Sequence, residues 1–140
     1  MTENLKKAKQ ILISENYTCV LLSDNKEYHS TLRGVRPLID LLELCADFSD
    51  FSAADKVIGA GAAYLYVLLG IREIWAITVS ERAKNILTAH EIQIYYDNCV
   101  AHIINRAGDG ICPIECAVAD AASPEDAYSK IKEALKRLNA

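Results

Sequence analysis

Two spacings of apolar residues divide this chain into predicted helices and predicted strands. Leu5, Ala8 and Leu12 lie three or four residues apart, which is the spacing of one helix face. Residues 73–79 (EIWAITV) form a short apolar run that is typical of a buried strand. The predicted elements are, in chain order, helix 3–15, strands 18–23 and 27–32, helix 37–45, strand 55–58, helix 62–69, strand 73–79, helix 81–89, strand 92–96 and helix 124–138.

The order of these elements predicts a three-layer α/β/α sandwich, with a mixed sheet of about five strands between helices. A turn at residues 24–26 joins the first two strands into a β-hairpin. The chain has no repeat or linker, so we expect one domain over residues 1–140. Residues 47–54 (DFSDFSAA) are expected to form a loop, and residues 97–120 are less regular.

The stretch 55–69 (DKVIGAGAAYLYVLL) joins a strand to a helix through small residues. Anions often bind at the helix N-terminus of such a junction. Gly59, Gly61 and Ala62 would let a ligand approach the backbone, so we expect them to hold a nucleotide phosphate or another anion. The Lys-Ser/Thr of a P-loop is missing here. The alternative is that these small residues serve close packing of the helix on the sheet, and both roles are compatible.

The loop NRAGDGICPIEC at residues 105–116 combines polar, flexible and reactive residues. Asn105 and Arg106 are candidates for binding a phosphate or carboxylate. Cys112 is a candidate nucleophile or redox thiol, and Asp109 lies between two glycines. The alternative is a tight surface turn with an Arg–Asp pair and a half-buried cysteine. Cys116 follows Cys112 by four residues, but the other ligands of a metal site are missing.

A second group of candidates lies at the end of the predicted hairpin. Ser30, Arg33 and Arg36 lie around the end of the hairpin, close to the start of the predicted helix 37–45. A hydroxyl and two guanidinium groups suit a phosphate or a carboxylate. The alternative is a solvated turn.

Composition narrows the classes of partner. The 140 residues are 51% hydrophobic and 24% charged, as in soluble globular proteins. A net charge of -4 and a pI near 5.3 argue against nucleic acid as a partner, and the apolar runs are too short to span a membrane. Five scattered cysteines without an export signal predict reduced thiols and a cytoplasmic location.

The chain also resembles known proteins. A helix after the hairpin and a small-residue turn after the third strand resemble the cytidine deaminase-like fold. The segments DKVIGAGAAYLYVLLG, WAITVSERA, YYD and IINRAGDGICPIE resemble a small family known as domain of unknown function 1893, over nearly the whole chain. Zinc deaminases carry a His or Cys and a Glu after the hairpin, and Pro-Cys-x-x-Cys at the next junction. Residues 34–37 and 59–63 hold neither, so the resemblance implies a zinc-free relative without metal or cofactor.

We therefore expect a protein that binds a small nucleotide- or base-like ligand. The pocket would lie between the predicted helix 62–69, the hairpin end and the loop at 105–116. In a catalytic version, Cys112 would be the nucleophile and Asp109 or Glu115 the proton carrier. The alternative is a non-catalytic regulatory or protein-interaction module whose former active site is filled by Ala and Gly side chains. We leave open whether the chain forms a homodimer.

Overall fold

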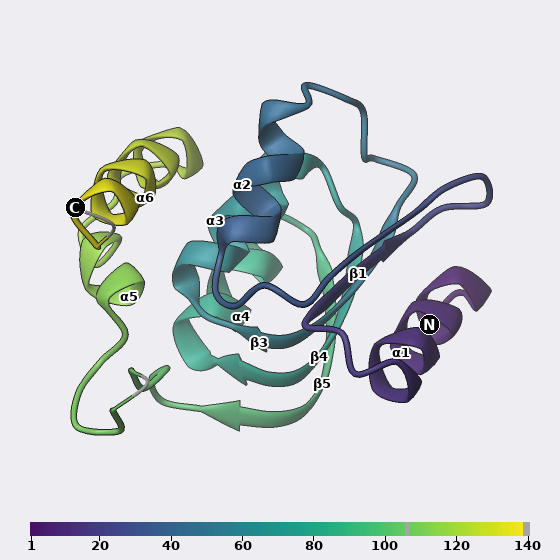
Figure 1. Ribbon diagram of the computed structural model, residues 1–140, viewed down its shortest axis with the longest axis horizontal. Helices are drawn as coiled ribbons and strands as arrows, with labels where there is room; N and C mark the ends of the chain where they lie inside the picture. Colours follow the sequence, from purple (N-terminus) through teal and green to yellow (C-terminus); the bar gives the residue numbers. More distant parts are fainter. Residues whose placement is uncertain (106, 139–140) are drawn as a thin grey trace.

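A five-stranded mixed sheet forms the centre of the computed structural model, which describes residues 1–105 and 107–138 (Figure 1). The strand order is β2-β1-β3-β4-β5. The elements are α1 (Glu3–Ser14), β1 (Cys19–Leu22), β2 (Glu27–Ser30), α2 (Arg36–Glu43), β3 (Ser52–Ile58), α3 (Ala60–Leu69), β4 (Glu73–Ser80), α4 (Glu81–Ala89), β5 (Gln93–Val100), α5 (Pro113–Ala117) and α6 (Pro124–Leu138). The predicted mixed sheet of five strands is confirmed.

The direction of the strands changes at β1. β1 pairs antiparallel with both β2 and β3, whereas β3, β4 and β5 are parallel. The register places Cys19 of β1 between Ser30 of β2 and Asp55 of β3. The end of the hairpin therefore lies beside the carboxyl end of β3, where ligands of α/β proteins tend to bind.

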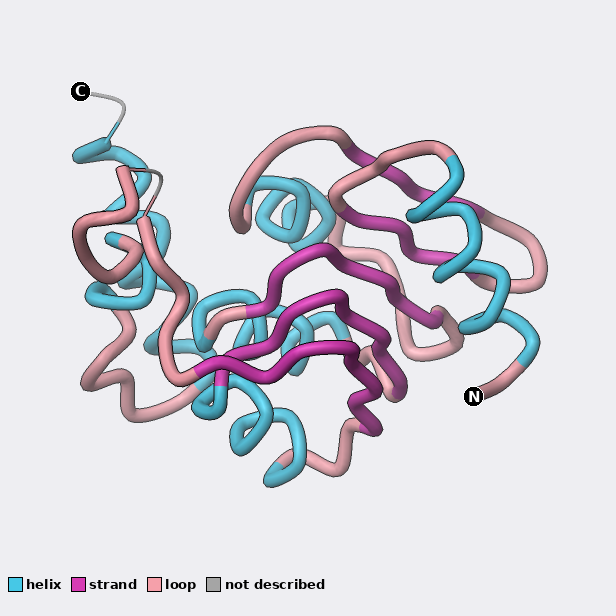
Figure 2. Tube along the Cα trace, turned by 90° about the horizontal axis from the view of Figure 1, so that it is seen from below, coloured by secondary structure: helices cyan, strands magenta, loops and turns pink. Residues whose placement is uncertain are grey.

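Helices cover both faces of the sheet, but unequally. On one face α1 buries Leu5, Ala8 and Leu12 against Val20, Trp75 and neighbouring side chains. On the other face the larger core joins side chains of α2, α3, α4 and α6 to the sheet. Figures 1 and 2 show α1 and α6 at opposite ends of the molecule.

The C-terminal helices pack on α3 rather than directly on the sheet. Ile131 and Ala134 of α6 and Ile114 of α5 are buried in the larger core. Gly61 of α3 faces both Ile114 and Ile131. The segment after β5 continues on the side of the molecule where β5 ends and places α5 beside the start of α3 (Figure 1).

Three stretches differ from the sequence predictions. Strand β3 begins at Ser52, inside the predicted loop 47–54, because Ala53 and Ala54 are fully buried between β1 and β4. Strand β5 continues to Val100 through exposed polar residues, since its backbone pairs with β4 up to Ser80. The irregular stretch 97–120 also contains the short helix α5. The added parts of β3 and β5 have no hydrophobic pattern typical of strands. They form because their backbones pair with neighbouring strands.

None of the helices in residues 1–105 and 107–138 has the length and apolar character needed to cross a membrane.

The packing of α1 on the sheet can be tested with two adjacent residues. Leu12 is 1% exposed, whereas its neighbour Ile13 is 57% exposed. We expect Leu12→Ala to lower the free energy of unfolding by about 2–5 kcal/mol, because it leaves a cavity against the sheet. Ile13→Ala should change it by about 0.5 kcal/mol or less. Urea unfolding followed by circular dichroism measures both, and equal losses would contradict the observed packing.

Candidate functional site

The N-terminus of α3, where the sequence predicts a bound anion, is capped by a carboxylate of the same chain. The backbone N–H of Ala60 donates to Glu115 Oε1 at 2.7 Å, and that of Gly61 donates to Oε2 at 3.0 Å. The N-cap residue Gly59 has no side chain to accept these bonds. Helix α3 begins at Ala60, two residues earlier than predicted, so the amides at its N-terminus are those of Ala60 and Gly61.

The glycines of this junction make room for α5. A Cβ atom on Gly61 would lie 2.6 Å from Cγ2 of Ile114, and one on Gly59 would overlap the Glu115 carboxylate. Ala62 is buried in the core instead of facing a ligand. The packing explanation for the small residues therefore holds in this structure, with Glu115 in the place of an external anion.

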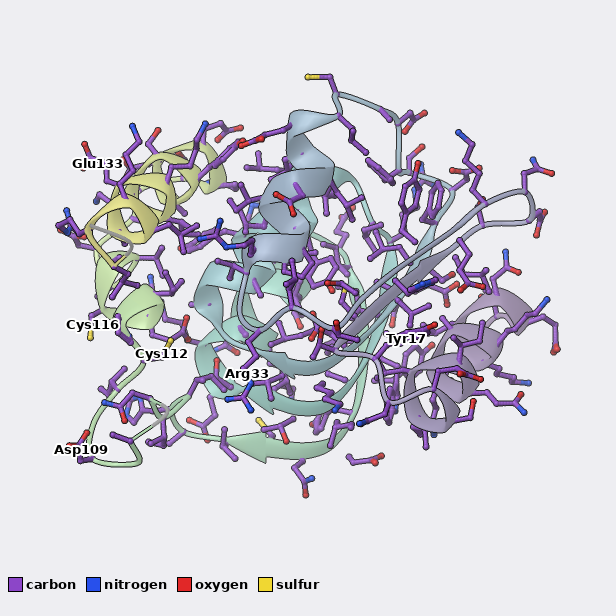
Figure 3. All side chains as sticks on the ribbon, viewed as in Figure 1. Tyr17, Arg33, Asp109, Cys112, Cys116 and Glu133 are labelled. Atoms are coloured by element: carbon purple, nitrogen blue, oxygen red, sulfur yellow. The ribbon has the colours of Figure 1, made fainter. Side chains whose placement is uncertain are left out.

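Hydrogen bonds of Asn105 stay within the loop to which it belongs. The side-chain amide of Asn105 donates to Asp109 Oδ1 at 3.0 Å, and Asn105 Oδ1 accepts the backbone N–H groups of Gly108 and Asp109. Figure 3 shows Asp109 at the outer tip of this loop, away from Cys112. The structure does not bring these two predicted catalytic residues together. Arg106, predicted to bind ligand, lies outside the described residues.

The other predicted residues have simple surroundings. Cys112 is half-buried against the large core at the N-cap of α5, and Cys116 is exposed. Arg33 and Arg36 are both exposed, on either side of the left-handed turn at Gly34. The catalytic roles of Cys112, Asp109 and Glu115 remain predictions. Since Glu115 already accepts two backbone hydrogen bonds, its geometry suits a cap better than a proton carrier.

A buried polar chain beneath the hairpin was missed by the sequence analysis. The Tyr66 hydroxyl donates to Asp55 Oδ2 at 2.6 Å, and Cys19 Sγ lies 3.5 Å from the same hydroxyl oxygen. Burial raises the pKa of Asp55 to about 7, although the bond from Tyr66 opposes this shift. Burial, together with the nearby Asp55, also raises the pKa of the Cys19 thiol far above its ordinary value, so this thiol stays protonated.

This polar chain ends at a small cleft between the hairpin and α2. The cleft has a volume of about 150 Å³, and its walls are formed by side chains of β1, β2 and α2. Cys19 and Leu21 form its inner part, and Ser30 and Asp40 supply polar groups. A half-buried carboxyl group with a strongly shifted pKa near a cleft is a recognised mark of functional sites.

The signal for this site was present in the sequence but incomplete. Asp55 is the first residue of the predicted strand 55–58, and the positions of Tyr64 and Tyr66 in the predicted helix 62–69 do not show which of them faces the core. The structure shows that Tyr66 is the core tyrosine, fully buried on the face of α3 toward β3. Only the pairing of β1 with β3 brings Cys19 to the same place.

In residues 1–105 and 107–138, no three His, Cys, Asp or Glu side chains are grouped so that they could hold a metal ion.

Comparisons with known proteins identify the family of this chain. A family model described as "TM1506: Domain of unknown function (DUF1893)" matches residues 7–135. The chain belongs to this family. The matched range of residues 7–135 spans the positions of Cys19, Asp55, Tyr66 and Glu115.

One solved structure gives the fold of a relative. A crystal structure of a DUF1893 family protein (TM1506) from Thermotoga maritima superimposes with a TM-score of 0.85. It covers 98% of this chain and 92% of its own, at 21% sequence identity. No curated protein sequence matches the chain. At this identity the DUF1893 structure shows a shared fold and no more.

The role of Glu115 as a helix cap leads to a stability prediction. We expect Glu115→Ala to lower the free energy of unfolding by about 1.5–3 kcal/mol, because two amides lose a charged acceptor. Glu133→Ala, an exposed position on α6, is the matched control and should have an effect within about 0.5 kcal/mol (Figure 3). Thermal and urea unfolding measure both variants. A loss no larger than that of the control would show that the cap is not stabilising.

The raised pKa of Asp55 predicts a pH dependence of stability. Between its ordinary value of 3.8 and about 7, the folded state holds a proton that the unfolded state has released. The contribution of Asp55 to the free energy of unfolding is therefore fully present below pH 3.8, falls as the pH rises through this window, and levels off above pH 7. Asp55→Asn should remove this slope in unfolding curves measured from pH 4 to 8, whereas the exposed control Asp50→Asn should retain it. Identical slopes for wild type and Asp55→Asn would contradict the burial of this carboxyl group.

Proposed function

We propose that this protein binds a small base- or nucleotide-like molecule, without zinc, in the cleft between the hairpin and α2. The observation that carries the proposal is the opening of the Asp55–Tyr66–Cys19 chain onto that cleft. The N-terminus of α3 is not part of this ligand site, because Glu115 already occupies its amides.

The shape and polarity of the cleft favour a single flat ring. Its volume of about 150 Å³ is below the range of about 300–1,000 Å³ that accommodates drug-sized ligands. Leu21, Tyr28 and Leu41 supply apolar and aromatic contacts, and Asp40 supplies a carboxylate that accepts hydrogen bonds. A heterocycle with an exocyclic amino group has the matching donors.

A phosphate would need a different part of the surface. The cleft itself is lined by no arginine or lysine in the described part of the chain. Arg33 and Arg36 lie close in sequence to the cleft residues Ser30 and Pro37, so these two guanidinium groups are the candidates for holding the anionic end of a nucleotide.

We further infer a relation to the cytidine deaminase-like fold, and this relation would support the class of ligand. The antiparallel hairpin followed by three parallel strands, in the order β2-β1-β3-β4-β5, agrees with that expectation. A cysteine-dependent reaction at Cys112 receives less support, because its predicted partner Asp109 lies at the loop tip.

Ligand-detected NMR and calorimetry with cytosine, uracil, adenine and their nucleosides and 5′-monophosphates would test the proposal. We expect amino-bearing bases to bind and Asp40→Asn to weaken them about tenfold or more, since a charged acceptor is lost. Glu43→Gln, an exposed position on the same helix, is the control and should bind as wild type does. The proposal fails if no compound binds, or if both variants weaken binding equally.

The filled N-terminus of α3 favours a second candidate, a non-catalytic interaction module. In that case none of the compounds would bind, and a partner protein would bind the folded chain with an affinity that Asp40→Asn leaves unchanged.

A further inference from the structure

A second depression lies between α4 and the start of α6, on the side of α3 away from the cleft of the hairpin. Its volume is about 400 Å³. Arg82, Asn85, Ile86, Ala89 and His90 line it from α4, at spacings of three, four, seven and eight residues, so they form one helix face. In the described part of the chain no helix covers this polar face, although α6 packs close by on α3.

The chemistry of this groove centres on Arg82. Its guanidinium donates from Nη2 to the carbonyl of Val118 at 2.7 Å, and its Cζ lies 6.0 Å from the centre of the Tyr64 ring. These two contacts hold the group at the wall of the groove. A guanidinium carries further N–H donors in a fixed fork, which matches the two oxygens of a carboxylate.

The remaining walls are aromatic, apolar or neutral. Tyr64 and Ile86 offer faces on which a ring can pack, and Asn85 and Ser123 offer neutral polar groups. No acidic side chain lines the groove in the described part of the chain. Asp126, in the first turn of α6, accepts the backbone N–H of Ala122 and pairs with the ammonium group of Lys130.

We propose that this groove is a binding site for small aromatic carboxylates, with the carboxylate on Arg82 and the ring between Tyr64 and Ile86. The site is separate from the cleft between the hairpin and α2. The two sites also differ in charge, since Arg82 supplies a guanidinium to the groove whereas Asp40 supplies a carboxylate to the cleft. The two sites therefore select different ligands.

Titration of the full-length ¹⁵N-labelled protein with benzoate tests this proposal, and benzamide serves as the neutral isostere. We expect saturable shifts of the amide signals of residues 85–90 and 122–123, and binding of benzamide about tenfold weaker or more, because a charged hydrogen-bond partner is absent. Shifts that do not saturate, or equal binding of benzamide, would overturn the proposal.

Two pairs of variants separate the site from general effects on the fold. Arg82→Gln should abolish the benzoate shifts, whereas Lys84→Gln, on the Tyr96 side of the same helix, should keep them. Ala89→Leu fills the groove without changing its charge and should weaken benzoate at least tenfold. Thr88→Leu, an exposed neighbour outside the groove, is its control and should bind benzoate as wild type does. Unchanged binding by Ala89→Leu would overturn the proposal even if Arg82→Gln fails to fold.

Discussion

The carboxylate of Glu115 on the first amides of α3 is the contact on which the arrangement of this protein depends. It joins the C-terminal segment to the strand–helix junction that follows β3. A helix N-terminus carries partial positive charge and unpaired N–H groups, so an acceptor there is stabilising. In many α/β proteins this acceptor is a ligand. Here it belongs to the chain itself, and Gly59 and Gly61 are small because Glu115 and Ile114 must approach closely.

Because Glu115 caps α3, the ligand site that we propose lies beneath the hairpin rather than at the N-terminus of this helix. With the α3 amides occupied, the polar groups available for a ligand are those beneath the hairpin. Asp55, Tyr66 and Cys19 come from β3, α3 and β1, and the antiparallel pairing of β1 with β3 brings them together. Burial keeps the Cys19 thiol protonated and raises the pKa of the Asp55 carboxyl group to about 7. Such a group is suited to hydrogen bonding in either protonation state.

The two proposed sites follow from how helices cover the sheet. Helix α2 leaves a small acidic cleft over the hairpin, and α6 leaves a wider basic groove beside α4. Both openings occur where a helix packs on its neighbour but does not cover it fully. Because Asp40 is acidic, the cleft would favour a cationic or neutral ring. Because Arg82 is basic, the groove would favour an aromatic anion.

The sequence by itself determined the helices and strands in which apolar residues recur at a regular spacing and in which a capping residue marks the start. Helix α4 was predicted with the observed bounds. Ser80 is a residue type that often caps a helix, and it directly follows an apolar strand. In the structure its hydroxyl accepts the backbone N–H of Ala83. The mixed sheet also followed from element order alone. Strand β3 was predicted too short, since Ala53 and Ala54 have no strand signature and are held by pairing on both sides.

Only the tertiary structure decided the candidate sites. Glu115 reaches Ala60 across 55 residues, and Cys19 meets Tyr66 across 47, so no local pattern reports either contact. The loop at 105–112 carried the most conspicuous residues, yet Asn105 and Asp109 satisfy each other at the surface. Local spacing determines helices and strands because their hydrogen bonds are short-range, whereas a site depends on which distant elements the sheet and its helices bring together.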